Sequence, residues 1–428
     1  MEVSKLHKLL VECNYLVSTD TRKIIPNSIF FALKGPNFDG NDYAIEAIKK
    51  GASYAVIDKD LESDLNQDSL IKVENALESL QNLANFNRLK SSAKVIALTG
   101  SNGKTTTKEL FKSVIEIKYN TVCTDGNLNN HIGVPLSLLK IKPDTEIAII
   151  EMGASNFGEI EFLTNLTHPD IGYITNFGKA HLEGFIDLDG VIKAKTELYN
   201  WLIKNNKTLL INHDDIEQKK FLNNNTISFG NNDNSNYHFV NISKNYVSVK
   251  YNGITVNTNL YGDYNFSNLC AAISIGLYFK IDINDISKKL KNFNLSINRS
   301  EFIEKNNKKI ILDAYNANPT SMKTAIESFE KIDGNKMVIL GDMYELGKHE
   351  KKEHEKIIKL CNSKKIDKCI FIGQIFYRLK NNNSSNYFYK NKGDFFENNN
   401  QINETNILIK GSRGMKMEEI FNRILWKK

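Results

Sequence analysis

Hydrophobic residues along the chain gather into short runs, and segments with a helical spacing of hydrophobic residues lie between these runs. Runs rich in β-branched residues occupy 95–99, 146–150, 171–175 and 208–211. A short continuous hydrophobic run is typical of a strand that is buried on both faces. Strands that alternate with helices predict a mostly parallel sheet covered by helices. The middle of the chain is therefore predicted to be an α/β unit.

The same alternation predicts a further α/β unit on each side. Strand-like runs at 28–33 and 54–57 belong to a small N-terminal unit. A second series of strand-like runs begins near residue 300, at 309–312, 336–340, 368–372 and 406–409. Charged connectors near 88–94 and 296–300 then divide the chain. We predict three domains: a small α/β domain at 1–88, a central phosphate-loop domain at 89–299 and a Rossmann-like α/β domain at 300–428.

Two further patterns predict irregular or antiparallel segments. Residues 246–260 are expected to form a hairpin around Asn252-Gly253, because Asn-Gly favours the type I′ turn. Two tracts rich in asparagine, 223–236 and 381–400, are expected to be long surface loops.

Composition and charge indicate a soluble, cytoplasmic protein that binds small molecules. The 428 residues are 41% hydrophobic and 25% charged, and the net charge of +6 comes from lysines interleaved with glutamates. A basic stripe for nucleic acid is not visible, so no nucleic-acid partner is expected. The five cysteines form no C-x-x-C pair, which favours a reducing compartment over a disulfide or zinc framework. The longest apolar run, near 269–279, is too short to cross a membrane, and no membrane insertion is expected.

The strongest local signal is a glycine-containing turn between a predicted strand and a predicted helix. Residues 99–107 read TGSNGKTTT, and 105–117 follow as a helix-forming stretch. Backbone N–H groups in such a turn bind phosphate, helped by the positive end of the helix dipole. Lys104 can reach the outer phosphates of ATP, and the Thr105 hydroxyl suits Mg²⁺. Leu98 stands where G-x-x-x-x-G-K-[ST] requires glycine, but the strand–turn–helix context favours an ATP site over a fortuitous turn.

Three later side chains are candidates for the same site. Glu151 ends the run 146–150, and ligands in open α/β sheets bind beyond the carboxyl ends of strands. A carboxylate there could hold Mg²⁺, although a glutamate in an ion pair is the plain alternative. His181 follows the next predicted strand, where a hydrogen-bonded loop histidine is the more common finding. Lys195 by itself has the pattern of a solvated helix residue, so only the order of the whole series makes it a candidate.

Eight segments in one order resemble the Mur ligases, a family of ATP-dependent amide-bond ligases. The central series of 100–107, Glu151, His181 and Lys195 resembles the central domain of that family. The eight segments are 19–23 (TDTRK), 30–40 (FFALKGPNFDG), 126–135 (GNLNNHIGVP), 151–154 (EMGA), 180–184 (AHLEG), 313–319 (DAYNANP), 340–347 (LGDMYELG) and 410–413 (KGSR). The resemblance covers nearly the whole chain. The first two segments are similar to the UDP-recognising N-terminal domain, and the others to the branch that adds D-alanyl-D-alanine.

The resemblance implies a catalytic set of Lys104, Glu151, His181 and Lys195. Thr105 and Glu151 would hold one Mg²⁺, and His181 and Lys195 a second. Lys195 would be N-carboxylated (carbamylated), which turns an amine into an anionic oxygen donor for a hard cation. The implied nucleotide-binding residues are Gly100, Ser101, Asn102, Gly103, Lys104, Thr105, Thr106, Asn268, Arg299 and Asn316. The implied substrate-binding residues are Thr19, Asp20, Thr21, Arg22, Lys34, Gly35, Asp39, Gly40, Asn129 and Asn130.

The chain departs from the family pattern at two positions. Asn298 stands where glycine is expected before Arg299, and His131 stands where an acidic residue is frequent. We therefore assign His131 no catalytic role. Without the resemblance, a helix cap or a surface position would explain Asn268, Arg299 and Asn316 as well.

The implied reaction is an amide synthesis in peptidoglycan precursor formation. The terminal carboxylate of UDP-MurNAc-tripeptide would attack the γ-phosphate of ATP, and the amine of D-Ala-D-Ala would then attack the acyl phosphate. The N-terminal domain would bind the UDP-sugar, while the C-terminal domain would bind D-Ala-D-Ala and close over ATP. A monomer is expected.

Several other functions compete with this one. The nearest are the enzyme that adds the third stem residue, for which an Asp-Asn-Pro-Arg sequence is missing, and a folylpolyglutamate synthetase, which lacks a nucleotide-sugar domain. A phosphate-loop NTPase switch would hydrolyse ATP without an amino acceptor. A non-catalytic nucleotide scaffold would not need the Lys104, Glu151 and His181 set.

Overall fold

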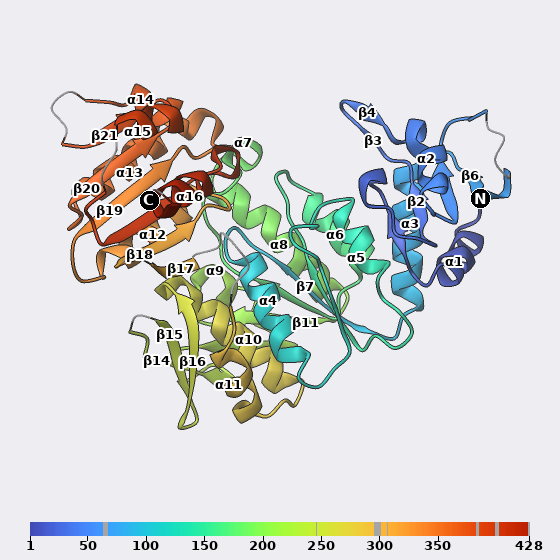
Figure 1. Ribbon diagram of the computed structural model, residues 1–428. Coiled ribbons are helices and arrows are strands. Elements are labelled where there is room, and N and C mark those ends of the chain that lie inside the picture. Colours follow the sequence, from blue (N-terminus) through green and yellow to red (C-terminus); the bar gives the residue numbers. More distant parts are fainter. Residues whose placement is uncertain are drawn as a thin grey trace.

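The structure of this protein, a computed structural model, consists of three α/β parts (Figure 1). It describes residues 1–62, 67–244, 246–294, 301–305, 307–381, 385–398 and 402–426. In Figure 1 the N-terminal part (blue) and the C-terminal part (orange and red) lie on opposite sides of the central part. The predicted fold class is thereby confirmed. No helix in the described ranges is both long enough and apolar enough to cross a membrane.

The N-terminal part is built on a small parallel sheet with the strand order β1-β2-β5-β6. Its strands are β1 (Val17–Ser18), β2 (Ile29–Phe31), β5 (Tyr54–Ile57) and β6 (Leu70–Lys72). A hairpin of β3 (Lys34–Gly35) and β4 (Phe38–Asp39) and three helices complete it: α1 (Val3–Glu12), α2 (Ala44–Lys49) and α3 (Ala76–Lys90). The predicted strands at 28–33 and 54–57 correspond to β2 and β5, whose hydrophobic side chains are almost all buried.

The central part contains a seven-stranded, all-parallel sheet with the order β13-β12-β11-β10-β7-β9-β8. Its strands are β7 (Lys94–Thr99), β8 (Thr121–Cys123), β9 (Ile147–Glu151), β10 (Ile171–Ile174), β11 (Thr208–Asn212), β12 (Thr226–Gly230) and β13 (Tyr237–His238). The four central strands expected from the sequence are β7, β9, β10 and β11. They lie next to one another, so the phosphate loop after β7 is flanked by the ends of β9 and β10.

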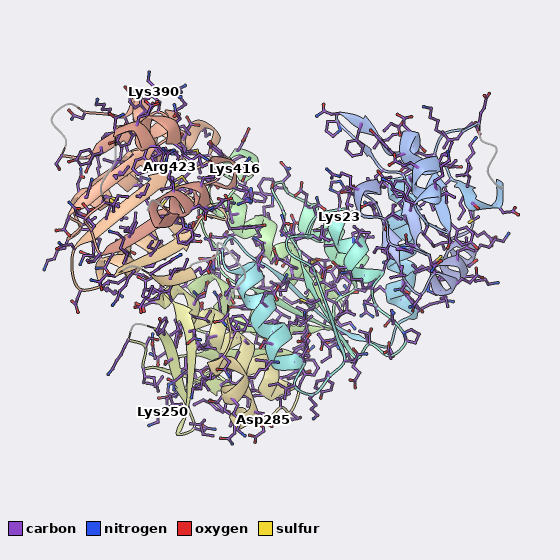
Figure 2. The ribbon with its side chains drawn as sticks, viewed as in Figure 1. Lys23, Lys250, Asp285, Lys390, Lys416 and Arg423 are labelled. Atoms are coloured by element: carbon purple, nitrogen blue, oxygen red, sulfur yellow. The ribbon has the colours of Figure 1, made fainter. Side chains whose placement is uncertain are left out.

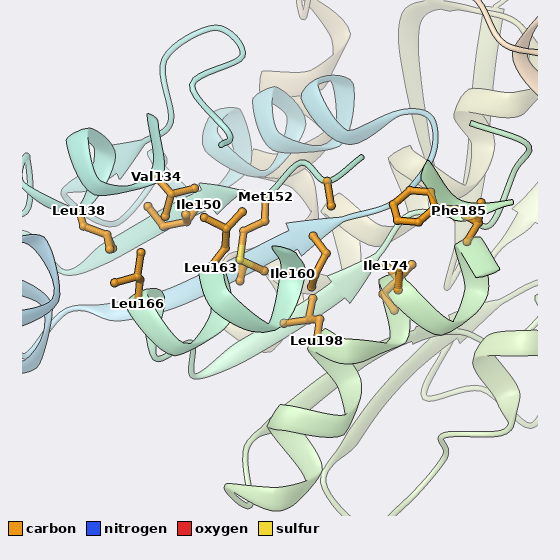
Figure 3. Packing of buried hydrophobic residues seen from close by; sticks show 14 of the residues in the cluster. Val134, Leu138, Ile150, Met152, Ile160, Leu163, Leu166, Ile174, Phe185 and Leu198 are labelled. Atoms are coloured by element: carbon orange, nitrogen blue, oxygen red, sulfur yellow. The ribbon is translucent and has the colours of Figure 1, made fainter. Parts of the chain in front are cut away.

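Helices cover both faces of the central sheet, which explains its uninterrupted hydrophobic runs. Val95 and Ala97 of β7 face one layer of helices, and Ile96 and Leu98 face the other. The first layer consists of α5 (Gly133–Leu138), α6 (Glu159–Thr167) and α8 (Leu188–Lys204), whose packing appears in Figure 3. The second layer consists of α4 (Lys104–Ile115), α10 (Phe266–Tyr278) and α11 (Ile283–Lys291).

A small antiparallel sheet is attached to the central part. It contains β14 (Val240–Asn241), β15 (Tyr246–Tyr251) and β16 (Ile254–Tyr261). Asn252 and Gly253 connect β15 and β16, with φ angles of 45° and 83°. Positive φ at both positions is the signature of the type I′ turn, so the predicted hairpin is confirmed.

The C-terminal part has a six-stranded sheet with the order β17-β18-β22-β19-β20-β21. Its strands are β17 (Glu301–Lys305), β18 (Lys308–Asp313), β19 (Lys336–Gly341), β20 (Lys368–Ile372), β21 (Tyr387–Tyr389) and β22 (Asn406–Lys410). Within the described strands of this sheet, β17–β18 is the only antiparallel pair. The helices are α12 (Pro319–Glu330), α13 (Glu350–Asn362), α14 (Gln374–Arg378), α15 (Lys392–Asn398) and α16 (Glu418–Trp426).

The two asparagine-rich tracts are not simply long loops, and that prediction is wrong. The first tract contains β12, and the second contains β21 and α15. In each case a few hydrophobic side chains between the asparagines are buried, such as Phe229, Phe388 and Phe395. Burial of these side chains accounts for the regular elements in tracts whose composition is mainly polar.

Helix α3 attaches the N-terminal part to the central part. The guanidinium of Arg88, which is buried, donates to the carbonyls of Thr167 and His168 at 2.9 and 2.8 Å and to the Asp170 carboxylate at 3.0 Å. Asn87, also buried, donates to two carbonyls near the end of α5. The predicted boundary at 88/89 falls inside this helix. The other predicted boundary, at 299/300, lies outside the described residues.

The outer surface carries charges of both signs. The charged residues labelled in Figure 2, among them Lys23, Lys250 and Asp285, are all exposed. On α13, Lys351 lies 4.0 Å from Glu355, an example of the interleaving seen in the sequence.

Candidate functional site

The phosphate loop has the backbone that its glycines permit. Gly100 has a φ of 140°, and a side chain there would collide with Thr175 at the end of β10. Gly103 has a φ of 78°, and its missing Cβ would lie 2.9 Å from the amide of Asn268. Helix α4 begins at the next residue, Lys104, whose Nζ donates to the Gly100 carbonyl at 2.7 Å. Lys104, which is predicted to bind phosphate, therefore bonds here to the backbone of its own loop.

Thr105 and Glu151 meet beneath this loop. The Thr105 hydroxyl donates to Glu151 Oε2 at 2.9 Å, and Asn129 Nδ2 donates to Oε1 at 2.8 Å. Glu151 is only 1% exposed, although it is an acidic residue. A buried carboxylate needs partners of this kind, because its desolvation is costly. The plain alternative of a surface ion pair for Glu151 is therefore wrong.

His181 faces the C-terminal part across the cleft. Its Nδ1 lies 2.6 Å from Glu345 Oε2 and 3.3 Å from the Ser155 hydroxyl. His181 and Glu345 both have left-handed backbones, with φ of 52° and 62°. The pair with His181 lowers the pKa of the Glu345 carboxyl. Two loops from different parts of the protein thus turn toward each other at this contact.

Lys195 is buried and not solvated, contrary to what its isolated sequence pattern suggests. It is 1% exposed on α8, and its Nζ donates to the Ala154 carbonyl at 3.2 Å. Burial, together with the nearby positive charge of Lys104, lowers its pKa to about 7. Its ammonium lies 5.2 Å from the centre of the Phe185 ring, which also packs edge-on against His181. Lys195 and His181 therefore flank the same aromatic ring.

These elements surround one cleft of about 560 Å³ between the central and C-terminal parts. Its walls include most of the predicted nucleotide site and both predicted asparagines of the 126–135 segment. The predicted residues that line it are Ser101, Asn102, Gly103, Lys104, Thr105, Thr106, Asn129, Asn130, Glu151, His181, Asn268 and Asn316. Gly100 and Lys195 are not among the lining residues, although Lys195 donates to the carbonyl of Ala154, which does line the cleft.

Asn268 has an unpaired acceptor at the cleft. Its side chain, 3% exposed, donates to Asn265 at 2.9 Å, while its Oδ1 is buried without a hydrogen-bond partner in the described structure. Such an acceptor is costly unless a ligand satisfies it. Asn316, in contrast, is exposed, and its Oδ1 accepts the N–H of Ala317. Arg299 lies outside the described residues.

The substrate residues predicted in the N-terminal part do not line this cleft. Asp20 instead accepts from the Arg22 guanidinium and backbone, which lowers the pKa of its carboxyl to about 2. Lys34 pairs with Asp58 at 2.8 Å. The remaining members of this set are Thr19, Thr21, Gly35, Asp39 and Gly40, which lie on the same N-terminal part.

Sequence reasoning missed several polar residues around the cleft. Glu345 and Asn318 belong to quoted segments but received no role of their own. Lys108 is fully buried, and its Nζ donates to the carbonyls of Thr124 and Gly126 at 2.7 and 3.0 Å, which fixes the loop that leads to Asn129. The helical spacing of Lys104 and Lys108, four residues apart, is a signal that could have placed both on one face of α4.

Three family matches span most of the chain. Residues 15–88 match the Mur ligase family, catalytic domain; residues 98–276 match the Mur ligase middle domain; and residues 298–412 match the Mur ligase, glutamate ligase domain. With this fold and this cleft, the chain belongs to the Mur ligase family.

Individual relatives are similar over nearly their full length. The chain is 34% identical over 424 residues to the UDP-N-acetylmuramoyl-tripeptide--D-alanyl-D-alanine ligase of Bacillus subtilis (strain 168), covering 96% of this chain and 93% of that protein. The protein of the same name from Escherichia coli (strain K12) is 31% identical over 419 residues, covering 94% and 92%.

Solved structures agree with this likeness. A crystal structure of MurF from Acinetobacter baumannii superposes with a TM-score of 0.86 at 27% identity, covering 96% of this chain and 93% of that one. The MurF ligase of Thermotoga maritima in complex with ADP gives 0.82 at 26% identity, covering 97% of both chains.

Proposed function

We infer that this chain uses ATP to join D-alanyl-D-alanine to UDP-MurNAc-tripeptide, forming UDP-MurNAc-pentapeptide, ADP and phosphate during peptidoglycan precursor synthesis. The similarity along almost the whole chain to ligases with this name carries the proposal. The cleft supports it chemically, because phosphate-loop, acidic and imidazole groups from separate segments line one space.

The reaction has two steps, and the first joins two anions. The terminal carboxylate of the tripeptide attacks the γ-phosphorus of ATP, the bond to the bridging oxygen breaks, and ADP leaves. Lys104 and the N–H groups of the 100–103 turn offset the repulsion between carboxylate and triphosphate. In the second step the amine attacks the acyl carbon, phosphate leaves with the bonding electrons, and the new amide nitrogen loses its extra proton. Closure of the cleft would protect the acyl phosphate from water.

Two pairs of residues are proposed to hold the two Mg²⁺ ions. Thr105 and Glu151 offer hard oxygen atoms that already lie 2.9 Å apart, which suits an ion that takes its other ligands from phosphate and water. His181 and Lys195 would hold the second ion. When bound, Mg²⁺ would offset negative charge on the phosphoryl groups. The described residues contain no group of three or more His, Cys, Asp or Glu side chains arranged for a metal. The remaining ligands would come from the nucleotide and water.

Glu345 is proposed to orient His181 for this role. Metal-binding histidines commonly hold one ring nitrogen on a carboxylate while the other binds the ion. With Nδ1 held 2.6 Å from Glu345, Nε2 of His181 remains for a ligand. This role would require the C-terminal part to be docked on the central part.

Carbamylation would make Lys195 an oxygen ligand. The unprotonated amine attacks carbon dioxide, an N–C bond forms, and one proton is released. An unmodified lysine is a poor ligand for a hard cation, whereas a carbamate offers two oxygen atoms. The burial of Lys195 on α8 favours loss of the ammonium charge.

The remaining nucleotide and substrate assignments are part of the same proposal. Asn268 would contact the adenine through its unpaired Oδ1, while Asn316 and Arg299 would border the nucleotide from the side of the C-terminal domain. The predicted residues of the N-terminal domain would bind the UDP-sugar, and the C-terminal domain would bind D-Ala-D-Ala. We place the reaction in the cytoplasm, in keeping with five free cysteines, and propose a monomer.

A phosphate-release assay with purified UDP-MurNAc-tripeptide tests the proposal. Release should require the tripeptide precursor, ATP and D-Ala-D-Ala together, and mass spectrometry should find the pentapeptide. A preference for a diamino acid or for glutamate as the amine would favour another ligase of the family. Steady ATP hydrolysis without any amine would favour an NTPase switch, and either result would overturn the proposal.

A further inference from the structure

One residue of the phosphate loop touches the C-terminal part directly. The Oδ1 of Asn102 accepts from Asn318 Nδ2 at 2.7 Å. Asn102 is itself held in place by its backbone, since its N–H donates to Asn176 at 3.1 Å and its carbonyl accepts from the Thr175 hydroxyl at 2.6 Å. The side chain that reaches across the cleft therefore starts from a fixed base.

Asn318 is fixed just as firmly on the other side. It is the N-cap of α12, where its Oδ1 accepts the N–H of Ser321 at 2.9 Å and the Ser321 hydroxyl completes a capping box. Pro319 follows at the first position of the helix, and Asn318 is 8% exposed. Because the cap uses only Oδ1, the amide nitrogen is free to be aimed at Asn102. Little side-chain entropy is lost when two fixed groups meet.

A second contact runs beside the first. The backbone N–H of Lys179 donates to the Thr320 hydroxyl at 2.9 Å, and Ser101 exchanges two hydrogen bonds with the backbone of Gly178 at 2.8 and 2.9 Å. A side chain at Gly178 would lie 3.0 Å from the Asn102 amide and 3.1 Å from Thr320. These hydrogen bonds fix the relative positions of the phosphate loop, the loop after β10 and the start of α12.

We propose that Asn318 is a positioning residue that couples the phosphate loop to docking of the C-terminal part. A nucleotide that orders the loop strengthens the contact, and the docked C-terminal part in turn holds the loop in its nucleotide-binding form. Such coupling is reciprocal by thermodynamic necessity. The inference rests on the proposed nucleotide site but not on the identity of the amine that is joined.

The alternative is that Asn318 only caps α12, and serine separates the two roles. Serine is as good an N-cap as asparagine, but its hydroxyl is too short to cap the helix and to reach Asn102 as well. Asn318→Ser therefore keeps the helix and removes the coupling contact. Asn391→Ser is the matched control, since Asn391 accepts the N–H of Asp394 at 3.0 Å at the start of α15 and does not line the cleft.

Calorimetric titration of the full chain with Mg²⁺–ADP measures the coupling. Asn318→Ser should weaken ADP binding about five-fold, as expected for one neutral hydrogen bond, with an unchanged urea midpoint. Asn391→Ser should bind like the wild type. Asn102→Ala removes the same contact from the other side without touching the cap. The double variant should therefore lose less ADP affinity than the sum of the two single losses, because both changes remove the same bond.

Hydrogen exchange supplies a second readout that a mere cap would not change. ADP should slow exchange of the first turn of α12 in the wild type and not in Asn318→Ser. Unchanged ADP affinity in Asn318→Ser, or fully additive effects in the double variant, would overturn the inference. ADP binding needs no ligation, so a wild type that binds ADP with this coupling but releases no phosphate would refute the proposed function alone.

Discussion

The N-terminal and C-terminal parts are joined to the central part in opposite ways. The N-terminal part is fastened through the buried side chains of Asn87 and Arg88 on α3, away from the cleft. The C-terminal part meets the central part across the cleft itself, through contacts such as His181–Glu345 and Lys179–Glu353 at 3.0 Å. The N-terminal attachment is a buried structural contact, whereas the C-terminal attachment forms part of the cleft.

This difference separates binding from chemistry. Residues on the C-terminal part, among them Asp313, Asn318 and Glu345, line the cleft beside the phosphate loop. Residues that we assign to the UDP-sugar stand apart on the N-terminal part (Figure 1). Changes in the N-terminal part should therefore alter affinity for the UDP-sugar, and changes across the cleft should alter nucleotide binding and turnover.

Removing Lys104 should have the largest effect on ligation, because we propose that both outer parts bring their substrates to the nucleotide beside Lys104. Lys104→Ala should lower kcat for phosphate release by about 10³-fold, since its charge matters most when the phosphoryl group is transferred. The urea midpoint should change little, because Lys104 is only partly buried. Ligation by this variant within a few-fold of the wild-type rate would contradict the assignment.

Removing the buried contacts of Arg88, which attach the N-terminal part to the central part, should lower the unfolding free energy. Arg88→Met leaves two carbonyls without their buried donor, while Asp170 keeps Lys207 at 3.0 Å. About 1–3 kcal/mol of unfolding free energy should be lost, as expected for buried acceptors left unsatisfied. Lys90→Met, on the exposed side of the same helix, is the control and should unfold like the wild type. Urea titration measures both. Equal midpoints for the two variants would mean that α3 is not the base of this attachment.

A pair of variants contrasts substrate binding with turnover. Arg22→Ala should raise KM for UDP-MurNAc-tripeptide about ten-fold with kcat nearly unchanged, as expected when one charged contact is lost equally from ground and transition states. Glu345→Gln should lower kcat instead, because His181 loses its anionic partner. Lys250→Ala, an exposed residue on β15 that does not line the cleft, should leave both constants unchanged. The reverse pattern, with kcat lost in Arg22→Ala, would break the comparison.

The smallest effect should be a pH dependence of the C-terminal part. His354 is fully buried, accepts the N–H of Met343 at 2.9 Å and lies 2.7 Å from the Glu350 carbonyl; burial lowers its pKa below the ordinary 6.5. Below about pH 6.5 the unfolded chain binds a proton there that the folded chain refuses, so stability falls as the pH falls.

A glutamine tests this assignment without removing the hydrogen bonds. His354→Gln offers the same donor and acceptor but does not titrate, so its melting temperature should fall less between pH 7 and pH 5.5 than that of the wild type. Parallel pH profiles of the two proteins would exclude His354 as the source. The nearby carboxylates of Asp342, 3.9 Å away, Glu350 and Glu353 are present in both proteins.

The sequence predicted the central sheet well because its strands are buried on both faces. Runs such as 95–99 carry their own signal, whereas two-residue strands such as β1 and β13 have none. The burial of Phe229 inside an asparagine-rich tract depends on packing against a distant helix, which composition does not record.

The site was predictable only as far as its motifs extend. The sequence identified Lys104 and Thr105 by local spacing, and the order of segments led to Glu151 and His181. It could not show that Lys195 is buried under Ala154, or that Asn318 meets Asn102, because 216 residues separate that pair. Contacts between parts of the chain arise from how the domains dock, and no local pattern encodes them.

The most direct test of the whole account is where a metal binds beside the nucleotide. Crystals grown with Mn²⁺ and a non-hydrolysable ATP analogue allow the ions to be located by anomalous diffraction. The account predicts one manganese between Thr105 and Glu151 and a second beside His181 and Lys195, with the triphosphate on the 100–106 turn. Manganese and triphosphate bound elsewhere, with Glu151 and His181 in contact with neither, would contradict it.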